Sequence, residues 1–166
     1  MTPFREEQRF ALWVTCLSAL TALAALIVPP VATWLAKDAS AIPVLIPVEL
    51  FVAALMLLPF NLLFITTEVN EKEVVVTFGR WFPVYRKRIQ LQNISETRAV
   101  YYRPIWDAGG WGIRWGCFEG KRCSYLNARG DRGVFLLHGP ETRLIIGSQE
   151  PEQLADAIRR AAGRHQ

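Results

Sequence analysis

Two apolar runs decide the fold of this chain: residues 10–35, FALWVTCLSALTALAALIVPPVATWL, and residues 42–65, IPVLIPVELFVAALMLLPFNLLFI. The first run has no charged side chain, and the second has only Glu49. An α-helix rises about 1.5 Å per residue, so roughly 20 apolar residues cross the ~30 Å hydrocarbon core of a bilayer. The two runs therefore predict two transmembrane helices, which together with a short N-terminal tail make residues 1–65 a membrane region.

The start of the chain argues against a cleaved signal peptide. Arg5 and Arg9 precede the first run, as basic residues do in a signal peptide, but Glu6 and Glu7 dilute that charge. The run is also longer than the apolar core of a signal peptide, and a second span follows almost at once. We expect the first helix to remain in the protein as a span.

The distribution of basic residues predicts the orientation of the spans, because short cytoplasmic segments are enriched in lysine and arginine. The connection at residues 36–41 holds one lysine and one aspartate. The basic residues near the other ends of the spans are Arg5, Arg9, Lys72, Arg80, Arg86, Lys87 and Arg88. This bias predicts a multi-pass protein of the inner (plasma) membrane with both termini in the cytoplasm. The net charge of +4 then favours anionic lipid headgroups over nucleic acid as a partner.

Residues 66–166 have the composition of one small soluble domain rich in β-structure. Short β-branched and aromatic runs alternate with turn residues about every ten positions, which is typical of an antiparallel meander forming a barrel or sandwich. The predicted strands are residues 63–69, 73–78, 84–91, 96–102, 112–115, 124–127, 133–138 and 143–146. The last element is a helix over residues 151–162, where Pro151 suits the first turn and Leu154 and Ile158 share one face. We expect this helix to cap one end of the barrel.

Strands followed by one terminal helix are also the plan of a pleckstrin-homology-like (PH-like) barrel. The chain resembles the small bacterial proteins in which two membrane spans precede a bacterial PH-like domain. The segments that carry the resemblance are GGWGIRW at residues 109–115, YLN at residues 125–127 and IIGSQEPEQL at residues 145–154. The resemblance implies a membrane-anchored binding or scaffold domain without a catalytic centre or a cofactor.

One departure from the wider PH family limits what the resemblance implies. Phosphoinositide-binding members carry a lysine followed by Arg-x-Arg in their first hairpin, whereas this chain has Arg86, Lys87 and Arg88 one strand further on. Phosphoinositide recognition is therefore not carried over to this chain.

The residue pattern favours a binding protein over an enzyme, because it contains no catalytic constellation and no glycine-rich phosphate loop. Cys117 and Cys123 have a spacing that can place them opposite each other in a hairpin. In a reducing cytoplasm we expect free thiols, and the less favoured alternative is a two-ligand metal site or a redox pair. Glu49 is interpreted as a carboxylate near the outer surface that reaches water or headgroups, and the alternative is an ion relay or a contact with a partner helix.

A cluster of basic and aromatic residues is the candidate binding site, since tryptophan favours the membrane interface and arginine binds phosphates. The cluster comprises Arg80, Trp81, Phe82, Tyr85, Arg86, Lys87 and Arg88, joined by Tyr101, Tyr102, Arg103 and Trp106. The residues expected to bind are Arg80, Trp81, Arg86, Lys87, Arg88 and Arg103. Alternation along a strand puts Arg86 and Arg88 on one face and Lys87 on the other, so a solvated strand face is an equal alternative.

Two hypotheses for function follow from this cluster and from the resemblance. The first is a membrane-anchored module at the inner leaflet that binds another membrane protein or a second copy of itself. The second is a module that senses anionic lipid or envelope stress. A small transporter subunit built around Glu49 is a third and weaker alternative.

Overall fold

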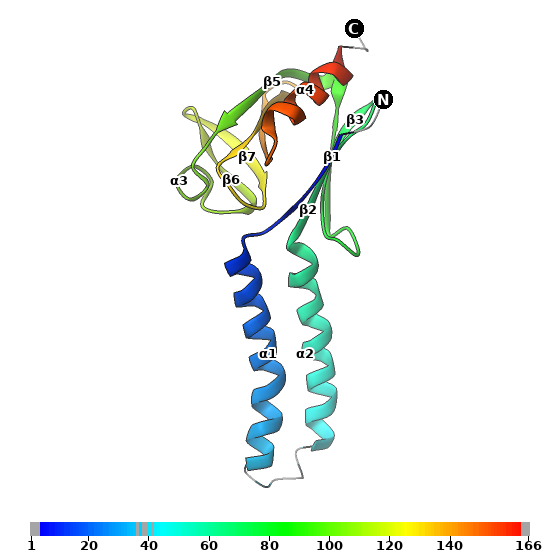
Figure 1. Cartoon of the computed structure of the whole chain (residues 1–166), viewed down its shortest axis with the longest axis vertical. Helices are drawn as coiled ribbons and strands as arrows, with labels where there is room; N and C mark the ends of the chain where they lie inside the picture. The colour runs from blue at the N-terminus through cyan, green and yellow to red at the C-terminus, as the bar shows by residue number, and fades with distance from the viewer. Residues whose placement is uncertain (1–3, 36, 38–39, 41, 164–166) are drawn as a thin grey trace.

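The computed structural model describes residues 4–35, 37, 40 and 42–163 of the chain, and Figure 1 shows them as a helical hairpin below a β domain. The helices are α1 (Leu12–Leu35), α2 (Ile42–Leu62), α3 (Pro104–Ala108) and α4 (Pro151–Ala162), and a 3₁₀ turn covers Leu91–Asn93. The strands are β1 (Phe4–Arg9), β2 (Phe64–Val69), β3 (Glu73–Phe78), β4 (Tyr85–Gln90), β5 (Ile94–Tyr101), β6 (Gly112–Phe118), β7 (Lys121–Asn127), β8 (Arg132–His138) and β9 (Thr142–Gly147).

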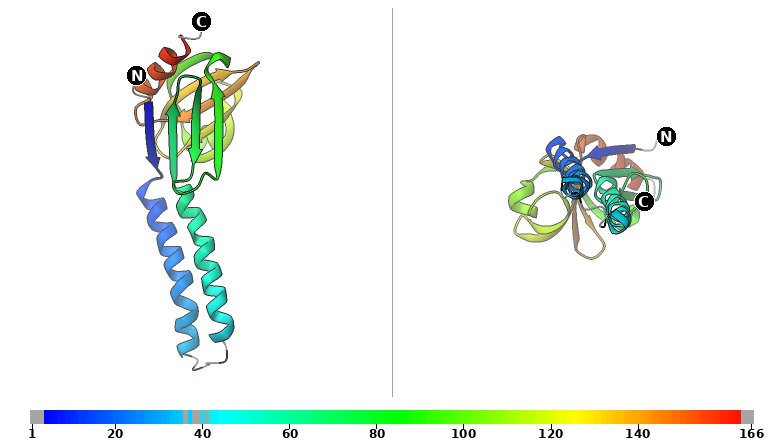
Figure 2. Two further views of the ribbon diagram at one scale, coloured as in Figure 1. Left: turned by 90° about the vertical axis from the view of Figure 1, so that its right-hand side faces the viewer. Right: turned by 90° about the horizontal axis from the view of Figure 1, so that it is seen from below.

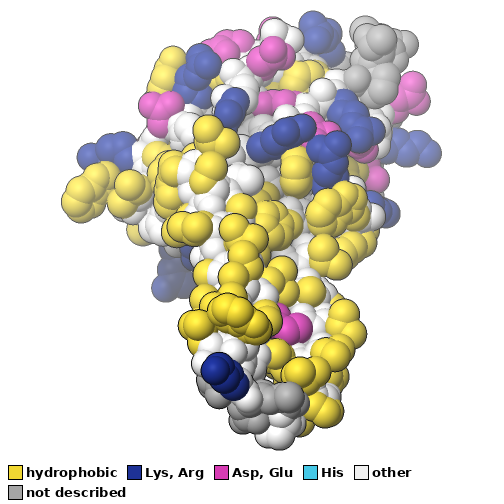
Figure 3. Space-filling view, turned by 60° about the horizontal axis from the view of Figure 1, so that its bottom comes forward, with side chains coloured by type: hydrophobic (Ala, Val, Ile, Leu, Met, Phe, Trp, Pro, Cys, Tyr) yellow, Lys and Arg dark blue, Asp and Glu magenta, His cyan; other side chains and the backbone are white. Residues whose placement is uncertain are grey.

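The two predicted spans are present as α1 and α2, which lie side by side and are both long and apolar enough to cross a membrane. The prolines do not end them: α1 continues through Pro29 and Pro30, and α2 continues through Pro47 and Pro59. Apolar side chains cover the hairpin, whereas charged side chains gather over the β domain (Figure 3). The predicted outer loop at residues 36–41 lies mostly outside the described residues.

At the β domain, α1 begins two residues later than predicted and α2 ends three residues earlier, because strand pairing replaces the helix there. The Phe10 N–H donates to the Leu63 carbonyl at 3.0 Å, directly beyond the pair Arg9 and Phe64 in the β1–β2 register. The antiparallel pairing of the two helices thus passes directly into the antiparallel pairing of β1 and β2, as Figure 2 shows.

The first sheet has the order β1-β2-β3-β4 and is antiparallel throughout. β2, β3 and β4 match predicted strands, but β1 has no counterpart among them. The N-terminal tail is therefore an edge strand of the sheet, and α1 and α2 are inserted between its first two strands.

The second sheet has the order β5-β8-β9-β7-β6, and the β7–β9 pair is parallel. The prediction of an antiparallel meander is therefore wrong, and the chain forms two sheets without a closed barrel among the described residues. β9 pairs with β8 on one side and with β7 on the other, so the β6–β7 hairpin is attached to the edge of β9 and not to β5.

The main core lies between the two sheets and α4. It is built from alternate residues of each strand, with Leu154 and Ile158 contributed by α4. The fully or almost fully buried residues in it include Ile65, Val74, Val76, Phe78, Ile89, Leu126, Val134, Leu136 and Ile146. α4 spans the residues predicted for it and packs on β5 and β8. A second, smaller core lies on the opposite face of the second sheet, around Tyr125 and Phe135.

Candidate membrane-proximal binding surface

The turn between β3 and β4 lies against the end of α2, and a single buried side chain fixes it there. The Asn61 amide donates from Nδ2 to the Phe82 carbonyl at 2.7 Å, and its Oδ1 accepts the Trp81 N–H at 2.8 Å. Gly79 has φ +115°, and a Cβ at that position would collide with the Phe82 carbonyl. The turn therefore needs both the glycine and the asparagine, and the end of the span determines its position.

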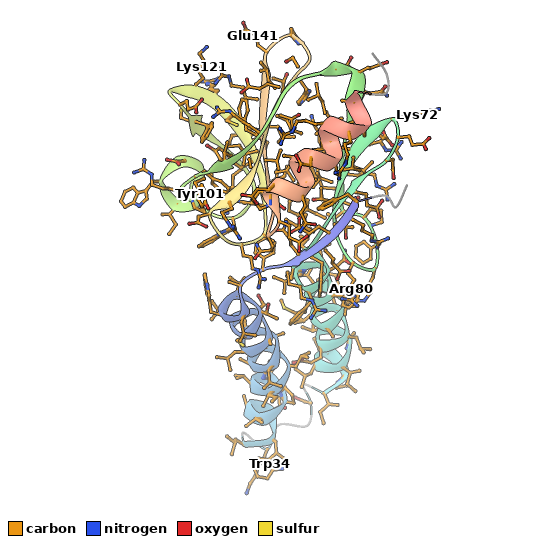
Figure 4. The ribbon with its side chains drawn as sticks, turned by 45° about the horizontal axis from the view of Figure 1, so that its top comes forward. Trp34, Lys72, Arg80, Tyr101, Lys121 and Glu141 are labelled. Carbon is orange, nitrogen blue, oxygen red and sulfur yellow. The ribbon has the colours of Figure 1, made fainter. Side chains whose placement is uncertain are left out.

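Arg80 and Trp81, two of the predicted site residues, lie in this turn between β3 and β4, and Figure 4 shows Arg80 beside the end of α2. The Arg80 guanidinium lies 3.1 Å from the Glu7 carboxylate and 4.9 Å from the centre of the Phe64 ring. Trp81 is 61% exposed, and the neighbouring Phe82 is also exposed. Exposed aromatic side chains beside arginine at the end of an apolar helix are typical of a membrane interface.

Arg86, Lys87 and Arg88 follow on β4, and the structure separates them as the alternation predicts. Arg86 and Arg88 are exposed on the outer face of the first sheet, and Lys87 is half-buried on the inner face. Lys87 is close enough to His138 to help lower the pKa of that imidazole, although burial of His138 is the larger cause.

Arg103 lies between β5 of the second sheet and α3, directly before the first residue of the helix. Its N–H donates to the Asp107 carboxylate at 2.7 Å, and its guanidinium forms a second bond to the same carboxylate at 3.2 Å. The six predicted site residues therefore do not form one patch. Arg80 and Trp81 lie beside α2, the β4 residues lie on both faces of the first sheet, and Arg103 lies on α3.

The segment of residues 109–115 fixes α3 against β6. Gly109, Gly110 and Gly112 all have positive φ, a backbone conformation that glycine adopts without a steric penalty. Gly116 is packed so closely on the Asp107 carbonyl that a Cβ would collide with it. The Asn127 side chain accepts the Gly112 N–H at 2.9 Å and so fixes the start of β6.

Asn127 also donates to the buried Tyr102 hydroxyl at 2.9 Å. Burial raises the pKa of Tyr102 to about 12, although the hydrogen bond from Asn127 opposes the shift. The phenol therefore stays neutral at physiological pH, and its contribution is structural.

Polar side chains on the inner face of β1 tie the N-terminal tail to the start of α4. The Glu6 carboxylate accepts the Ser148 hydroxyl at 2.6 Å and the Gln149 N–H at 2.7 Å. The Gln8 amide donates to the Gly147 carbonyl at 2.7 Å. These bonds were not predicted, because β1 presents glutamate and glutamine to the interior and thus lacks the apolar alternation of a strand. Asn61, which fixes the β3–β4 turn, was not predicted either, because the sequence shows only a single asparagine at the end of an apolar run.

The two cysteines of the second sheet do not face each other. Cys123 pairs with Gly116 and Cys117 with Arg122, so the two thiols lie on opposite faces of the hairpin. Cys117 is exposed and Cys123 is buried, and burial raises the pKa of the Cys123 thiol to about 12. Among the residues that the structure describes, His, Cys, Asp and Glu form no group of three that could hold a metal ion.

Glu49 lies on the face of α2 that is partly shielded from the surroundings, together with Leu45, Val52 and Met56. Its Oε2 atom is buried without a hydrogen-bond partner among the described residues. The carboxylate is thus on the shielded side of α2.

Searches of protein-family models, of curated proteins and of solved structures found no match to this chain.

Proposed function

We propose that this protein is a noncatalytic, membrane-anchored interaction module, in which two spans hold a β domain in a fixed pose against the bilayer. The observation that carries the proposal is the absence of a linker: β1 passes into α1, and α2 passes into β2, within one or two residues. A domain mounted this way cannot rotate freely about its anchor. Such a mounting suits a scaffold that presents one face to a partner in the same membrane.

We also propose that the β domain is a divergent member of the PH-like class. Two packed sheets with one C-terminal helix over the core support this assignment. The parallel β7–β9 pair is the feature that makes it divergent from an antiparallel arrangement.

The spacing of exposed tryptophans on α1 supports a transmembrane position for the hairpin. Trp13 and Trp34 lie near its two ends and are 60% and 77% exposed. They are separated by 21 residues in the sequence, which corresponds to about 31 Å of helix and matches the thickness of a bilayer core. The basic residues beside the spans favour placing the β domain at the inner leaflet.

An open depression beside the edge strand β6 is a second exposed surface where a protein partner could bind. It is lined by residues that include Trp115, Cys117, Arg122 and Arg143, and Trp115 is 77% exposed. Tryptophan and arginine are the residues most enriched at the centres of protein interfaces.

Photo-crosslinking in native membranes tests the proposed function. A photoreactive amino acid is placed at Trp115, at Arg122 and at Arg86, in three separate full-length variants, with Lys72 in the β2–β3 turn as the control position. We expect at least one of the three to give a discrete adduct of reproducible mass that the control position does not give. Only diffuse lipid adducts or no adduct at all three positions would contradict a protein-interaction module.

An anionic-lipid module is the second candidate function, and a specific feature of the structure favours it. Three arginines lie in turns at the end of the β domain beside the spans: Arg80 between β3 and β4, Arg103 before α3, and Arg129 between β7 and β8.

A further inference from the structure

α3 lies at the end of the second sheet that faces the spans. It follows the end of β5 and precedes Gly112 at the start of β6. Gly112 lies beside Phe10: a Cβ added to this glycine would be 4.0 Å from the Phe10 ring. Phe10 in turn joins β1 to α1. Figure 4 shows Tyr101 on the span side of Lys121 and Glu141, and Figure 2 shows α3 to one side of the helices when the molecule is viewed from below.

The surface of α3 is apolar where it meets solvent. Ala108 is buried against the second core, whereas Ile105 and Trp106 are 61% and 82% exposed. Tyr101, one residue before the turn into α3, is also exposed. A short helix that buries an alanine and exposes a tryptophan and an isoleucine has its largest apolar side chains outside the fold, where they gain no stability from packing.

Charge differs between the two ends of the β domain. The strand ends and turns beside the spans carry five arginines and three carboxylates: Arg9, Arg80, Arg103, Arg129, Arg132, Asp107, Asp131 and Glu150. Those at the opposite end carry two lysines and four carboxylates: Lys72, Lys121, Glu71, Glu73, Glu119 and Glu141. Counted over these turns and strand ends, the end beside the spans is therefore the more positive one, which is complementary to an anionic leaflet. Arginines inside the elements near the opposite end are not part of this count: Arg5, Arg122, Arg143, Arg159 and Arg160.

We propose that α3 is a second membrane contact, at which Ile105 and Trp106 insert among the headgroups of an anionic leaflet while Arg103 and Arg129 bind lipid phosphates. The contact lies on the α1 side of the hairpin, and Trp81 and Phe82 form the corresponding contact beside α2. Two contacts on different sides of the spans hold the β domain upright on the bilayer. This inference goes beyond the proposed interaction module, because it needs no protein partner, and it gives the second candidate function, an anionic-lipid module, a specific site.

Charge and continuity favour lipid over protein as the occupant of this surface. Tryptophan and tyrosine beside arginine make up the interfacial belt of membrane proteins. The surface also adjoins the bilayer that the spans would cross, so a lipid headgroup reaches it without any further association step. A second copy of the chain or another protein is an outcome of the test below.

The test measures the depth of a nitroxide label at Ile105→Cys in the full-length protein, with Cys16→Ala, Cys117→Ser and Cys123→Ala removing the native thiols. The protein is placed in nanodiscs of phosphatidylcholine, in nanodiscs that also contain phosphatidylglycerol, and in detergent. The readout is the ratio of label relaxation by lipid-dissolved oxygen to relaxation by a water-soluble nickel chelate. The same label at Thr142→Cys, an exposed residue at the opposite end of the domain, is the control position.

We expect the ratio at position 105 to be high in phosphatidylglycerol nanodiscs at low salt. It should be lower in nanodiscs of phosphatidylcholine alone, and also lower in phosphatidylglycerol nanodiscs when salt screens the headgroups. Arg103→Gln with Arg129→Gln should lower it toward the value at position 142, because the phosphate contacts are lost. Arg5→Gln with Arg160→Gln removes the same charge from exposed positions away from this end and should leave the ratio unchanged.

Three results would overturn the proposal. One is a low ratio at position 105 in all three environments, which places α3 in water. Another is spin–spin broadening that depends on protein concentration, which assigns the surface to a second copy. The third is an equal loss of the ratio in the two double-arginine variants, which removes the specific role of α3. None of these results depends on whether the crosslinking experiment finds a protein partner.

Discussion

At the scale of single residues, Asn61 is the side chain on which the membrane-proximal turn depends most. We expect Asn61→Ala to destabilise the β domain by about 1–2 kcal/mol, because the variant leaves the Trp81 N–H and the Phe82 carbonyl without their partners. Hydrogen exchange of full-length protein in nanodiscs should also show faster exchange across the β3–β4 turn than in the wild-type protein.

The matched control for this prediction is Gln92→Ala. Gln92 also uses its side-chain amide in a hydrogen bond, to Gln90 at 3.3 Å, but it is exposed. Its loss should change stability by less than about 0.5 kcal/mol. Equal effects of the two substitutions, or unchanged exchange in Asn61→Ala, would show that the turn does not depend on the end of the span.

His138 gives a prediction for pH dependence. Burial, with a smaller contribution from Lys87, lowers the pKa of His138 in the folded protein below its ordinary value of 6.5. Below pH 6.5 the unfolded chain takes up a proton at this histidine that the folded chain does not. The histidine therefore makes stability fall as the pH falls from 6.5 toward the lowered pKa, and it has no effect at higher pH.

We expect His138→Gln to flatten part of the loss of thermal stability between about pH 7 and pH 5, compared with the wild-type protein. Carboxylates titrate in both proteins, so the measured quantity is the difference between the two curves. Curves that remain parallel throughout this range would exclude the linkage.

At the scale of elements, the sequence predicted what local pattern determines and missed what tertiary contacts determine. All eight predicted strands and the helix at Pro151–Ala162 are present, because apolar alternation and helix periodicity are local signals. The order of the strands is not local: the parallel β7–β9 pair depends on packing against α4 and the first sheet. The same holds for β1, whose inner face is polar and becomes stable only when Glu6 meets the start of α4.

The pairing of β1 is tested by two neighbouring glutamates that face opposite sides of that strand. Glu6→Gln should cost about 1–2 kcal/mol, because it replaces a charged acceptor of two hydrogen bonds at the start of α4 with a neutral one. Glu7→Gln removes only an exposed ion pair with Arg80 and should cost less than about 1 kcal/mol.

Urea unfolding of the detergent-solubilised protein, followed by tryptophan fluorescence, measures both effects. A larger loss in Glu7→Gln than in Glu6→Gln would indicate that the tail does not pack against α4 as described. Glu7→Ala with Arg80→Ala provides the control in which the exposed pair is removed without leaving an unpaired charge.

The candidate site shows the same division between local and tertiary information. The sequence located Arg80, Trp81 and Arg103 but did not single out Arg129. It also predicted the separation of Lys87 from Arg86 and Arg88. It could not place Arg80 beside α2 and Arg103 on α3, since that separation depends on which sheet each strand joins. Residues 104–108 were not predicted as a helix, because a helix of five residues has little periodicity to detect.

At the scale of the whole molecule, the β domain and the membrane hairpin are one continuous structure. The chain enters the first sheet as β1, leaves it for α1 and α2, and returns as β2 beside the strand it left. A fragment that begins at Thr66 lacks β1 and starts inside β2, so it loses an edge strand and the Glu6 contacts with α4. We expect such a fragment to be unfolded or aggregated.

The same connectivity predicts a soluble version of the domain. Phe10 and Leu63 are hydrogen-bonded neighbours at 3.0 Å, so a short Gly/Ser turn can join residue 10 directly to residue 63 in place of the spans. We expect this chimera to give dispersed amide resonances and cooperative thermal unfolding, whereas the fragment from Thr66 gives neither. Moving the sequence of residues 4–10 to the C-terminus of the same fragment keeps the composition and removes the β1–β2 hairpin connection, and it should restore folding less well. A fragment from Thr66 that folds as stably as the chimera would show that β1 is dispensable, and the rigid mounting of the domain on its spans would lose its structural basis.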